Sequence, residues 1–232
     1  MNRVKACVVA VGLALLPASA IADPPTPAPA APAAKPDVAT LLFDTPQWSN
    51  AAAGTSLTYA YKRVTAQPTY GPSFDDKIVL KLEKGDEPNS RTVDVKMFTG
   101  PHTKAAGPFQ SDTQNPVLLL VLEANVEELS QLWRANPRYL KDAIRKAWRD
   151  DAKIEDVPVM VDGKSIPGTR ITIEPFQNDA EKDRMGGLET MVYTVEIADG
   201  VPGRIARIDI HAPATGKPTF SETMTYQSET TP

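Results

Sequence analysis

The strongest constraint on the fold is that apolar and polar side chains alternate with a period of two over much of the chain. In the first such segment Leu57, Tyr59 and Tyr61 share one side of an extended backbone, and Thr58 and Lys62 share the other. The same alternation recurs at 78–83, 93–97, 157–161, 169–174, 191–197, 206–210 and 220–226. A period of two with one apolar face indicates half-buried antiparallel strands.

The period changes to that of a helix between residues 116 and 151. Asn-Pro at 115–116 and again at 136–137 combines an N-cap residue with proline at the first helical position. Asn125, with Glu128 three residues later, has the form of a further cap. The last stretch places one apolar stripe at helical spacing, namely Leu140, Ala143, Ile144, Ala147 and Trp148. We therefore expect two or three short helices, with Trp148 buried against the sheet.

Strands joined by short turns favour an antiparallel meander, and the helices are the only large elements able to cover its apolar face. The expected fold class is α+β, mainly antiparallel β, with a strongly curved sheet or incomplete β-barrel of about eight or more strands and a central helical insert. Residues 99–114 and 176–188 are expected to be long loops. Asp37 is expected to cap a short helix at 37–43, and residues 37–232 are expected to form a single domain.

Residues 1–22 have the three parts of a cleavable secretory signal. Arg3 and Lys5 are positive, residues 6–18 are mainly apolar, and two A-x-A cleavage patterns end at Ala20 and Ala22. The apolar run is shorter than the roughly 20 residues of a membrane-spanning helix, which favours cleavage over an uncleaved anchor. We therefore expect a periplasmic or secreted protein that is soluble after signal cleavage. Cys7, the only cysteine, would leave with the signal, so no disulfide is expected.

Residues 23–36 are rich in proline and alanine. Proline removes backbone donors and favours an extended chain, so this segment is expected to be a disordered leader. It would be either a leader without a role or a spacer that lets the folded part stand away from a surface.

Composition and motif content argue against several functions. The chain has 25 basic and 29 acidic residues, and signal cleavage removes only basic ones, which argues against a nucleic-acid partner. His102 and His211 are far apart in sequence, so no metal site is expected. Gly163-Lys164-Ser165 lacks the earlier glycine of a phosphate-binding loop, because Pro158 stands there. No serine lies in a G-x-S-x-G motif, and we expect neither an enzyme nor a cofactor.

The order of elements resembles that of the periplasmic carriers of outer-membrane lipoproteins and their relatives. The resemblance is carried by the Leu57-Tyr59-Tyr61 strand, the helical insert from Asn115 to Asp151 and the strands from Gly168 to Gln227. It implies an incomplete β-barrel that holds helices as a lid over an apolar cavity, with a lipid or an acylated protein as ligand.

Two sets of residues are candidates for binding. In a carrier, the apolar side of the strands would line a cavity; in another kind of protein it would only pack against the helices. This set comprises Tyr59, Tyr61, Met97, Met191, Tyr193, Phe220, Met224 and Tyr226. The second set, called the basic strip, comprises Arg138, Lys141, Arg145 and Arg149, whose spacings of 3, 4 and 4 place them on one side of a helix. The strip is either a solvated face or a docking surface for an anionic membrane or an acidic envelope protein.

Two functions remain open from the sequence. The first is an exported, periplasmic binding or carrier protein for an apolar or amphipathic ligand, such as a lipid or lipoprotein. The alternative is a non-catalytic cell-envelope protein that acts through protein–protein contacts in integrity or assembly. A cavity favours the first, and a filled core with an exposed apolar patch favours the second.

Overall fold

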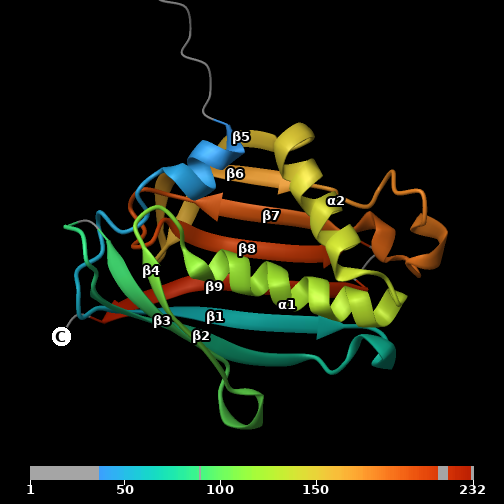
Figure 1. The fold of residues 1–232 in the computed structure, drawn as a ribbon, viewed down its shortest axis with the longest axis horizontal. Helices are drawn as coiled ribbons and strands as arrows, with labels where there is room; N and C mark the ends of the chain where they lie inside the picture. The colour runs from blue at the N-terminus through green and yellow to red at the C-terminus, as the bar shows by residue number, and fades with distance from the viewer. Residues whose placement is uncertain (1–36, 89, 214–218, 231–232) are drawn as a thin grey trace, which may run out of the picture. The chain divides into compact units, whose positions relative to one another are not determined.

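Nine antiparallel strands form one sheet in the computed structural model, which describes residues 37–88, 90–213 and 219–230 (Figure 1). The strands lie side by side in the order β4-β3-β2-β1-β9-β8-β7-β6-β5. Their bounds are β1 (Ser56–Thr65), β2 (Phe74–Lys84), β3 (Arg91–Met97), β4 (Lys104–Ser111), β5 (Lys153–Val161), β6 (Lys164–Ile173), β7 (Val192–Ile197), β8 (Ile205–Ala212) and β9 (Phe220–Thr230).

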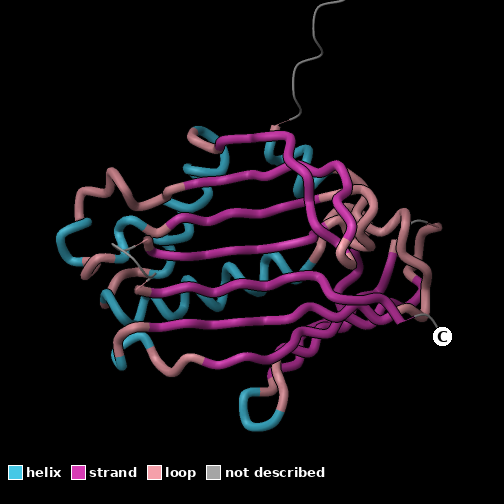
Figure 2. Tube along the Cα trace, turned by 180° about the vertical axis from the view of Figure 1, so that it is seen from behind, coloured by secondary structure: helices cyan, strands magenta, loops and turns pink. Residues whose placement is uncertain are grey.

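The sheet consists of two meanders joined by the first and the last strand. Strands β1 to β4 pair in sequence order, strands β5 to β9 do the same, and β1 pairs with β9. The sheet curves and stays open, with β4 and β5 as its edges (Figures 1 and 2). The expected fold class, mainly antiparallel β with a central helical insert, is confirmed. The pairing of β1 with β9 was not predicted, because local periodicity does not reveal which distant strands are neighbours.

Strand β4 corrects the sequence prediction, which treated residues 99–114 as a loop. Gly107-Pro108 interrupts the alternation, and most of the strand's side chains are exposed. As an edge strand it has only one neighbour, β3, and the register shifts between Val93 and Val95 of that neighbour. Proline and irregular pairing are tolerated at such an edge, so the segment lacks the pattern of a central strand.

Two helices follow β4 and lie against one face of the sheet (Figure 1). Helix α1 (Pro116–Trp133) is capped by the Asn115 side chain, which accepts a hydrogen bond from Val117 N at 3.2 Å. Helix α2 (Pro137–Asp150) is capped in the same way by Asn136, at 2.9 Å from Arg138 N. The cap expected at Asn125 is wrong: α1 continues through it, and the Asn125 side chain is buried under the helix.

Before β1, a short helical segment leads into η1 (Thr40–Asp44), and the Asp37 carboxylate accepts a hydrogen bond from Thr40 N at 2.8 Å, as expected of an N-cap. The remaining helical elements are single turns that lie in the loops. They are η2 (Pro68–Tyr70), η3 (Gly100–His102), η4 (Lys182–Arg184) and η5 (Leu188–Thr190).

The main core lies between the sheet and the two helices. Leu57, Tyr59 and Ile78 of the sheet and Leu129 and Leu140 of the helices are fully buried there. Trp148 is also buried, with 8% of its surface exposed, as its place in the apolar stripe of α2 predicted. The helices therefore cover the apolar face of the sheet.

The expected signal (1–22) and proline-rich leader (23–36) lie outside the described residues. Residues from Pro36 to Pro232 form one compact unit. None of the helices in the described part of the chain is long and apolar enough to cross a membrane.

Candidate functional site

A groove of about 600 Å³, which we call the η1–α2 groove, lies on the helical side of the molecule. Its walls come from the turn before η1, from α1, from α2 and from the start of β5. Most of its lining is apolar: Val38, Ala39, Phe43, Leu119, Leu122, Val126, Ile144, Trp148, Ala152 and Ile154. A concave, mainly apolar site of this size is typical of small-molecule binding.

A second groove of about 480 Å³, called the α1–β4 groove, lies between α1, α2 and the ends of β3 and β4. Its apolar wall includes Met97, Leu120, Ala124 and Val126. Lys104 and Glu127 add charge at its border. Both grooves therefore depend on the side of α1 that faces away from the core.

Three members of the basic strip lie on the wall of the η1–α2 groove: Lys141, Arg145 and Arg149. Each contacts an acidic side chain. Lys141 Nζ is 2.5 Å from Glu123, Arg145 Nη1 is 3.3 Å from Asp142, and Arg149 Nε is 2.8 Å from Asp150. Arg138, 88% exposed, lies on the wall of neither groove. The structure thus associates part of the strip with an apolar site, and its role in docking stays a prediction.

The candidate ligand-lining residues are mostly enclosed in the core rather than in a groove. Tyr59, Tyr61, Met97, Met191, Tyr193, Phe220 and Met224 are buried, and Tyr226 is half-buried. Of the eight, Met97 borders the α1–β4 groove. Tyr226 packs edge-on against Tyr59, with ring centroids 5.8 Å apart. Whether any of the eight contacts a ligand stays a prediction.

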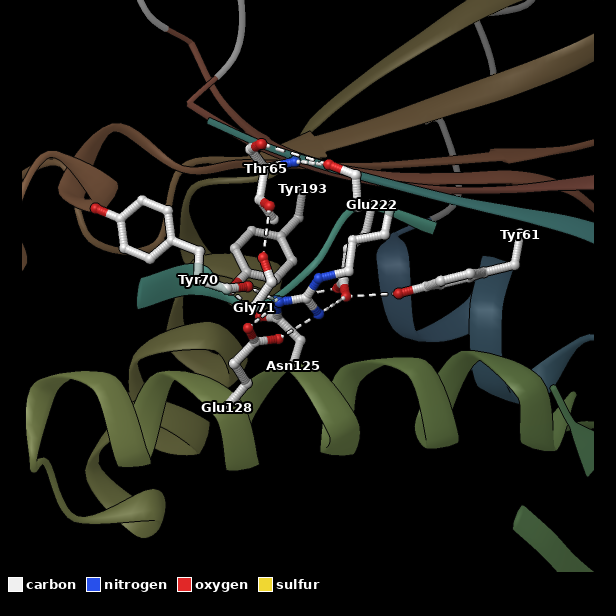
Figure 3. Close-up of polar contacts among 10 residues, drawn as sticks. Tyr61, Thr65, Tyr70, Gly71, Asn125, Glu128, Tyr193 and Glu222 are labelled. Atoms are coloured by element: carbon white, nitrogen blue, oxygen red, sulfur yellow. Dashed lines mark hydrogen bonds and ion pairs between the residues drawn. The ribbon is translucent and has the colours of Figure 1, made fainter. Parts of the chain in front are cut away.

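A buried charge cluster lies between α1 and the sheet (Figure 3), and the sequence analysis did not predict it. Arg63 Nη1 of β1 lies 2.7 Å from Glu128 of α1 and 2.9 Å from Glu222 of β9, and its Nη2 contacts Glu128 as well. Tyr61 donates a hydrogen bond to Glu222 at 2.6 Å. The Arg63 side chain is only 11% exposed and that of Glu222 only 8%.

Two neutral side chains extend this cluster across the interior. Tyr193 of β7 donates to Asn125 of α1 at 2.8 Å, and Asn125 in turn donates to Glu222 at 3.4 Å. The guanidinium of Arg63 also lies over the Phe220 ring, 5.1 Å from its centroid. The cluster therefore ties α1 to three strands that are remote in sequence.

Burial and the opposite charges of the neighbours compete in setting the pKa values of the cluster. Burial raises the pKa of Glu222, against the opposing effects of the Tyr61 hydrogen bond and the positive charge of Arg63. Burial alone would lower the pKa of Arg63, but Glu128 and Glu222 outweigh it, and the pKa is raised. One guanidinium thus faces two carboxylates in a low-dielectric interior, where a charge without a partner is costly.

The sequence did contain a signal for this cluster. Arg63 continues the inward-facing series of Leu57, Tyr59 and Tyr61, and Glu222 lies between inward-facing neighbours on β9. A lone charge on the apolar face of a predicted strand indicates a buried partner. Arg63 and Glu222 are direct cross-strand partners, which could be inferred only with the β1–β9 pairing in hand.

The two histidines are in different environments. His102 stacks on Phe74, with ring centroids 5.5 Å apart, and His211 Nδ1 lies 2.6 Å from Asp209. Burial opposes the ionisation of Asp209, but hydrogen bonds from His211 and Arg207 outweigh it and lower its pKa to about 2. Within the described residues, no three His, Cys, Asp or Glu side chains are grouped so that they could hold a metal ion.

No protein-family model matches the chain, and no curated protein matches it. Among solved structures, the crystal structure of the Mycobacterium tuberculosis lipoprotein LppX is similar to it. The match covers 76% of this chain and 87% of that chain, with 15% sequence identity and a TM-score of 0.32. A likeness at this level carries no argument about function, so the function is inferred from the geometry of the site.

Proposed function

We propose that this protein binds an amphipathic ligand outside the cytoplasm and carries it without changing it chemically. The apolar part of the ligand occupies the η1–α2 groove, and its acidic part lies at the basic residues of α2. The observation that supports this most directly is that Lys141, Arg145 and Arg149 line the same groove as Leu119, Leu122 and Ile144. An apolar site with a few charged groups at its border suits a ligand that has both characters.

The acidic partners of these cations do not oppose binding strongly. The Arg145 side chain is 69% exposed, and its contact with Asp142 spans one helical turn. Ion pairs of this exposed kind contribute at most about 1 kcal/mol, because water screens them and two long side chains must be ordered. An acidic group of a ligand, anchored by its apolar part, would therefore compete for Arg145 at low cost.

Binding rather than catalysis is supported by where the buried ionisable groups lie. The buried charge cluster of Arg63, Glu128 and Glu222 lies in the interior and lines neither groove. Its members are engaged with one another, and none is placed on the wall where a ligand would lie.

The alternative function through protein contacts would draw on exposed apolar side chains. The large ones in the described residues are Val64, Leu119, Tyr139 and Met160, which belong to four different elements. Val64 and Met160 lie on β1 and β5, with four strands between them. Leu119 already belongs to the η1–α2 groove, which makes the groove the more specific feature.

Ligand binding can be tested by titrating the purified protein with monomeric lysophosphatidylglycerol and following tryptophan fluorescence, since Trp148 lines the groove. The wild type is expected to bind, and Leu119→Glu is expected to weaken binding at least about tenfold, because it places a charge on the apolar wall. Met160→Glu, an equally drastic change at a side chain 62% exposed on β5, is the matched control and should bind like the wild type. Equal binding by all three proteins, or binding by none, would overturn the proposal.

Export is proposed on the basis of residues 1–22 alone. Amino-terminal sequencing of protein from the cell envelope is expected to find Asp23 or Ile21 first, since these follow the two A-x-A patterns. Met1 on the abundant form would contradict export.

A further inference from the structure

The two grooves are not independent, because they share part of their walls. Glu123, Val126 and Lys141 line both of them. Lys141 belongs to α2 and Glu123 to α1, and their ion pair at 2.5 Å crosses from one helix to the other. The Lys141–Glu123 ion pair therefore lies at the junction of the two grooves.

Away from this junction, each groove has apolar residues of its own from the outer side of α1. Leu119 and Leu122 line the η1–α2 groove, whereas Leu120 and Ala124 line the α1–β4 groove. Successive residues of a helix point about 100° apart, so Leu119 and Leu120 point in different directions and line different grooves. The outer side of α1 thus separates two apolar channels that share one ion pair, Lys141 with Glu123.

We propose that the ligand has two apolar chains joined at one acidic group, as in a free diacyl glycerophospholipid with an anionic head group. This rests on the proposed function and specifies its ligand class. One chain lies in the η1–α2 groove and the other in the α1–β4 groove, and α1 passes between them. Lys141 at the junction binds the acidic group.

The surroundings of Lys141 fit this assignment. Its side chain is 32% exposed, so it is reachable from solvent and partly screened from it. Its partner Glu123 is 57% exposed and can turn into water when an acidic ligand group replaces it. Each groove has one further cation near this point, Lys104 of β4 in the α1–β4 groove and Arg145 of α2 in the η1–α2 groove. Acidic residues line the grooves as well, namely Glu127 in the first and Asp37 and Asp150 in the second.

The test compares one chain with two at a constant head group. Dihexanoyl phosphatidylglycerol and its single-chain lyso form both serve as monomeric probes in calorimetric titrations of the full mature protein. The wild type is expected to bind the two-chain probe at least about tenfold more tightly, since a second buried chain adds apolar contact. Lys141→Gln is expected to weaken binding of both probes but to leave binding of uncharged dihexanoylglycerol unchanged.

Two substitutions on α1 distinguish the channels. Ala124→Trp fills the α1–β4 groove and is expected to lower the affinity for the two-chain probe to that for the single-chain probe, which itself is unchanged. Leu119→Trp narrows the η1–α2 groove and is expected to weaken both. Met160→Trp on β5 lines neither groove and should alter neither affinity.

The outcomes separate this inference from the proposed function. If the single-chain probe binds and the two-chain probe binds no more tightly, the two-channel assignment is wrong and the proposed function stands. The same follows if Ala124→Trp leaves the two-chain affinity unchanged. If neither probe binds to the wild type, both proposals fail.

Discussion

Helix α1 has two sides that use charge in opposite ways. On the inner side, Glu128 and Asn125 are held in the buried charge cluster with Arg63 and Glu222. On the outer side, Glu123 pairs with Lys141 at the junction of two apolar grooves and stays largely exposed. The inner contacts join one helix to the sheet, whereas the outer contact is the one that we propose is exchanged for a ligand. Burial, rather than residue type, decides which role a charge takes.

The same contrast appears between two arginine–glutamate pairs in the sheet. Arg63 lies opposite Glu222 in the β1–β9 register, and Arg170 lies opposite Glu196 in the β6–β7 register. The Arg63 side chain is 11% exposed and that of Arg170 is 42% exposed. Both pairs are cross-strand partners, and they differ in burial. Comparing them therefore measures how burial changes the contribution of an arginine–glutamate pair to stability.

The largest effect is expected from Arg63→Met. This change removes the only cation from a buried cluster of two carboxylates, and breaking a buried ion pair in this way typically costs about 3–5 kcal/mol of unfolding free energy. Arg170→Met is the matched control and should cost less than about 1 kcal/mol. Denaturant unfolding of both variants measures the difference. Equal losses would mean that burial does not distinguish the two pairs.

Trp148→Ala is expected to lower the unfolding free energy by about 3 kcal/mol, at the lower end for truncation of a buried aromatic residue. One part of the side chain packs in the core and another lines the η1–α2 groove, so some of its surface is not enclosed. The denaturant midpoint measures the effect. An unchanged midpoint would show that α2 does not use this face against the sheet.

Glu222→Gln is expected to change stability by no more than about 1 kcal/mol at neutral pH, since it leaves Arg63 paired with Glu128 and keeps an oxygen that can accept from Tyr61. The pKa of Glu222 is raised in the folded protein, so as pH falls the folded state binds this proton before the unfolded chain does. Acidification toward the ordinary Glu pKa of about 4.3 should therefore stabilise the wild type relative to this variant. The measurement is the unfolding free energy of both proteins as a function of pH, and a difference that does not change with pH would contradict the prediction.

Asp209→Asn provides the control of opposite sign. The pKa of Asp209 is lowered to about 2, so its contribution is present above the ordinary Asp value and is lost as pH falls toward 2. The wild type should therefore lose its advantage over this variant on acidification, and that advantage should be about 2 kcal/mol at neutral pH. A pH-independent difference would mean that the contacts with His211 and Arg207 do not depend on the charge of Asp209.

The smallest effects on stability are expected at the exposed basic strip. Arg145→Glu and Arg138→Glu should each change the unfolding free energy by no more than about 0.5 kcal/mol, as is usual for surface positions. They should differ in binding, because Arg145 lines the η1–α2 groove and Arg138 does not. Only Arg145→Glu should weaken binding of an anionic amphiphile, and added salt should reduce that difference. Equal weakening by both variants would favour a docking surface along the whole strip.

Much of the fold could be predicted from local patterns. Alternation located eight of the strands, and the Asn-Pro pairs at 115–116 and 136–137 located the starts of both helices. The missed strand, β4, is interrupted by Gly107-Pro108 and mostly exposed, so no alternating apolar face marks it. Asn125 was mistaken for a cap because its sequence context is that of a helix start, whereas its side chain bonds to Tyr193 and Glu222.

The candidate sites were predictable only in part, because a groove belongs to several elements at once. The spacing of the basic strip is a property of one helix and could be read from the sequence. Which of its members border an apolar wall depends on how η1, α1 and β5 pack around α2. The inward faces of the strands were predictable too, but the helices that fill the space above them decide where a cavity remains.

The sequence by itself determined which residues form strands and helices and which faces turn inward, because periodicity and capping are local properties of the chain. Only the tertiary structure decided that Arg63 meets Glu222, 159 residues away, and that both meet Glu128. It also decided that Lys141 stands between two grooves. These contacts depend on long-range strand pairing and on the packing of the helices, and no local sequence pattern contains either. They determine which charged side chains are buried in the cluster and which line a groove.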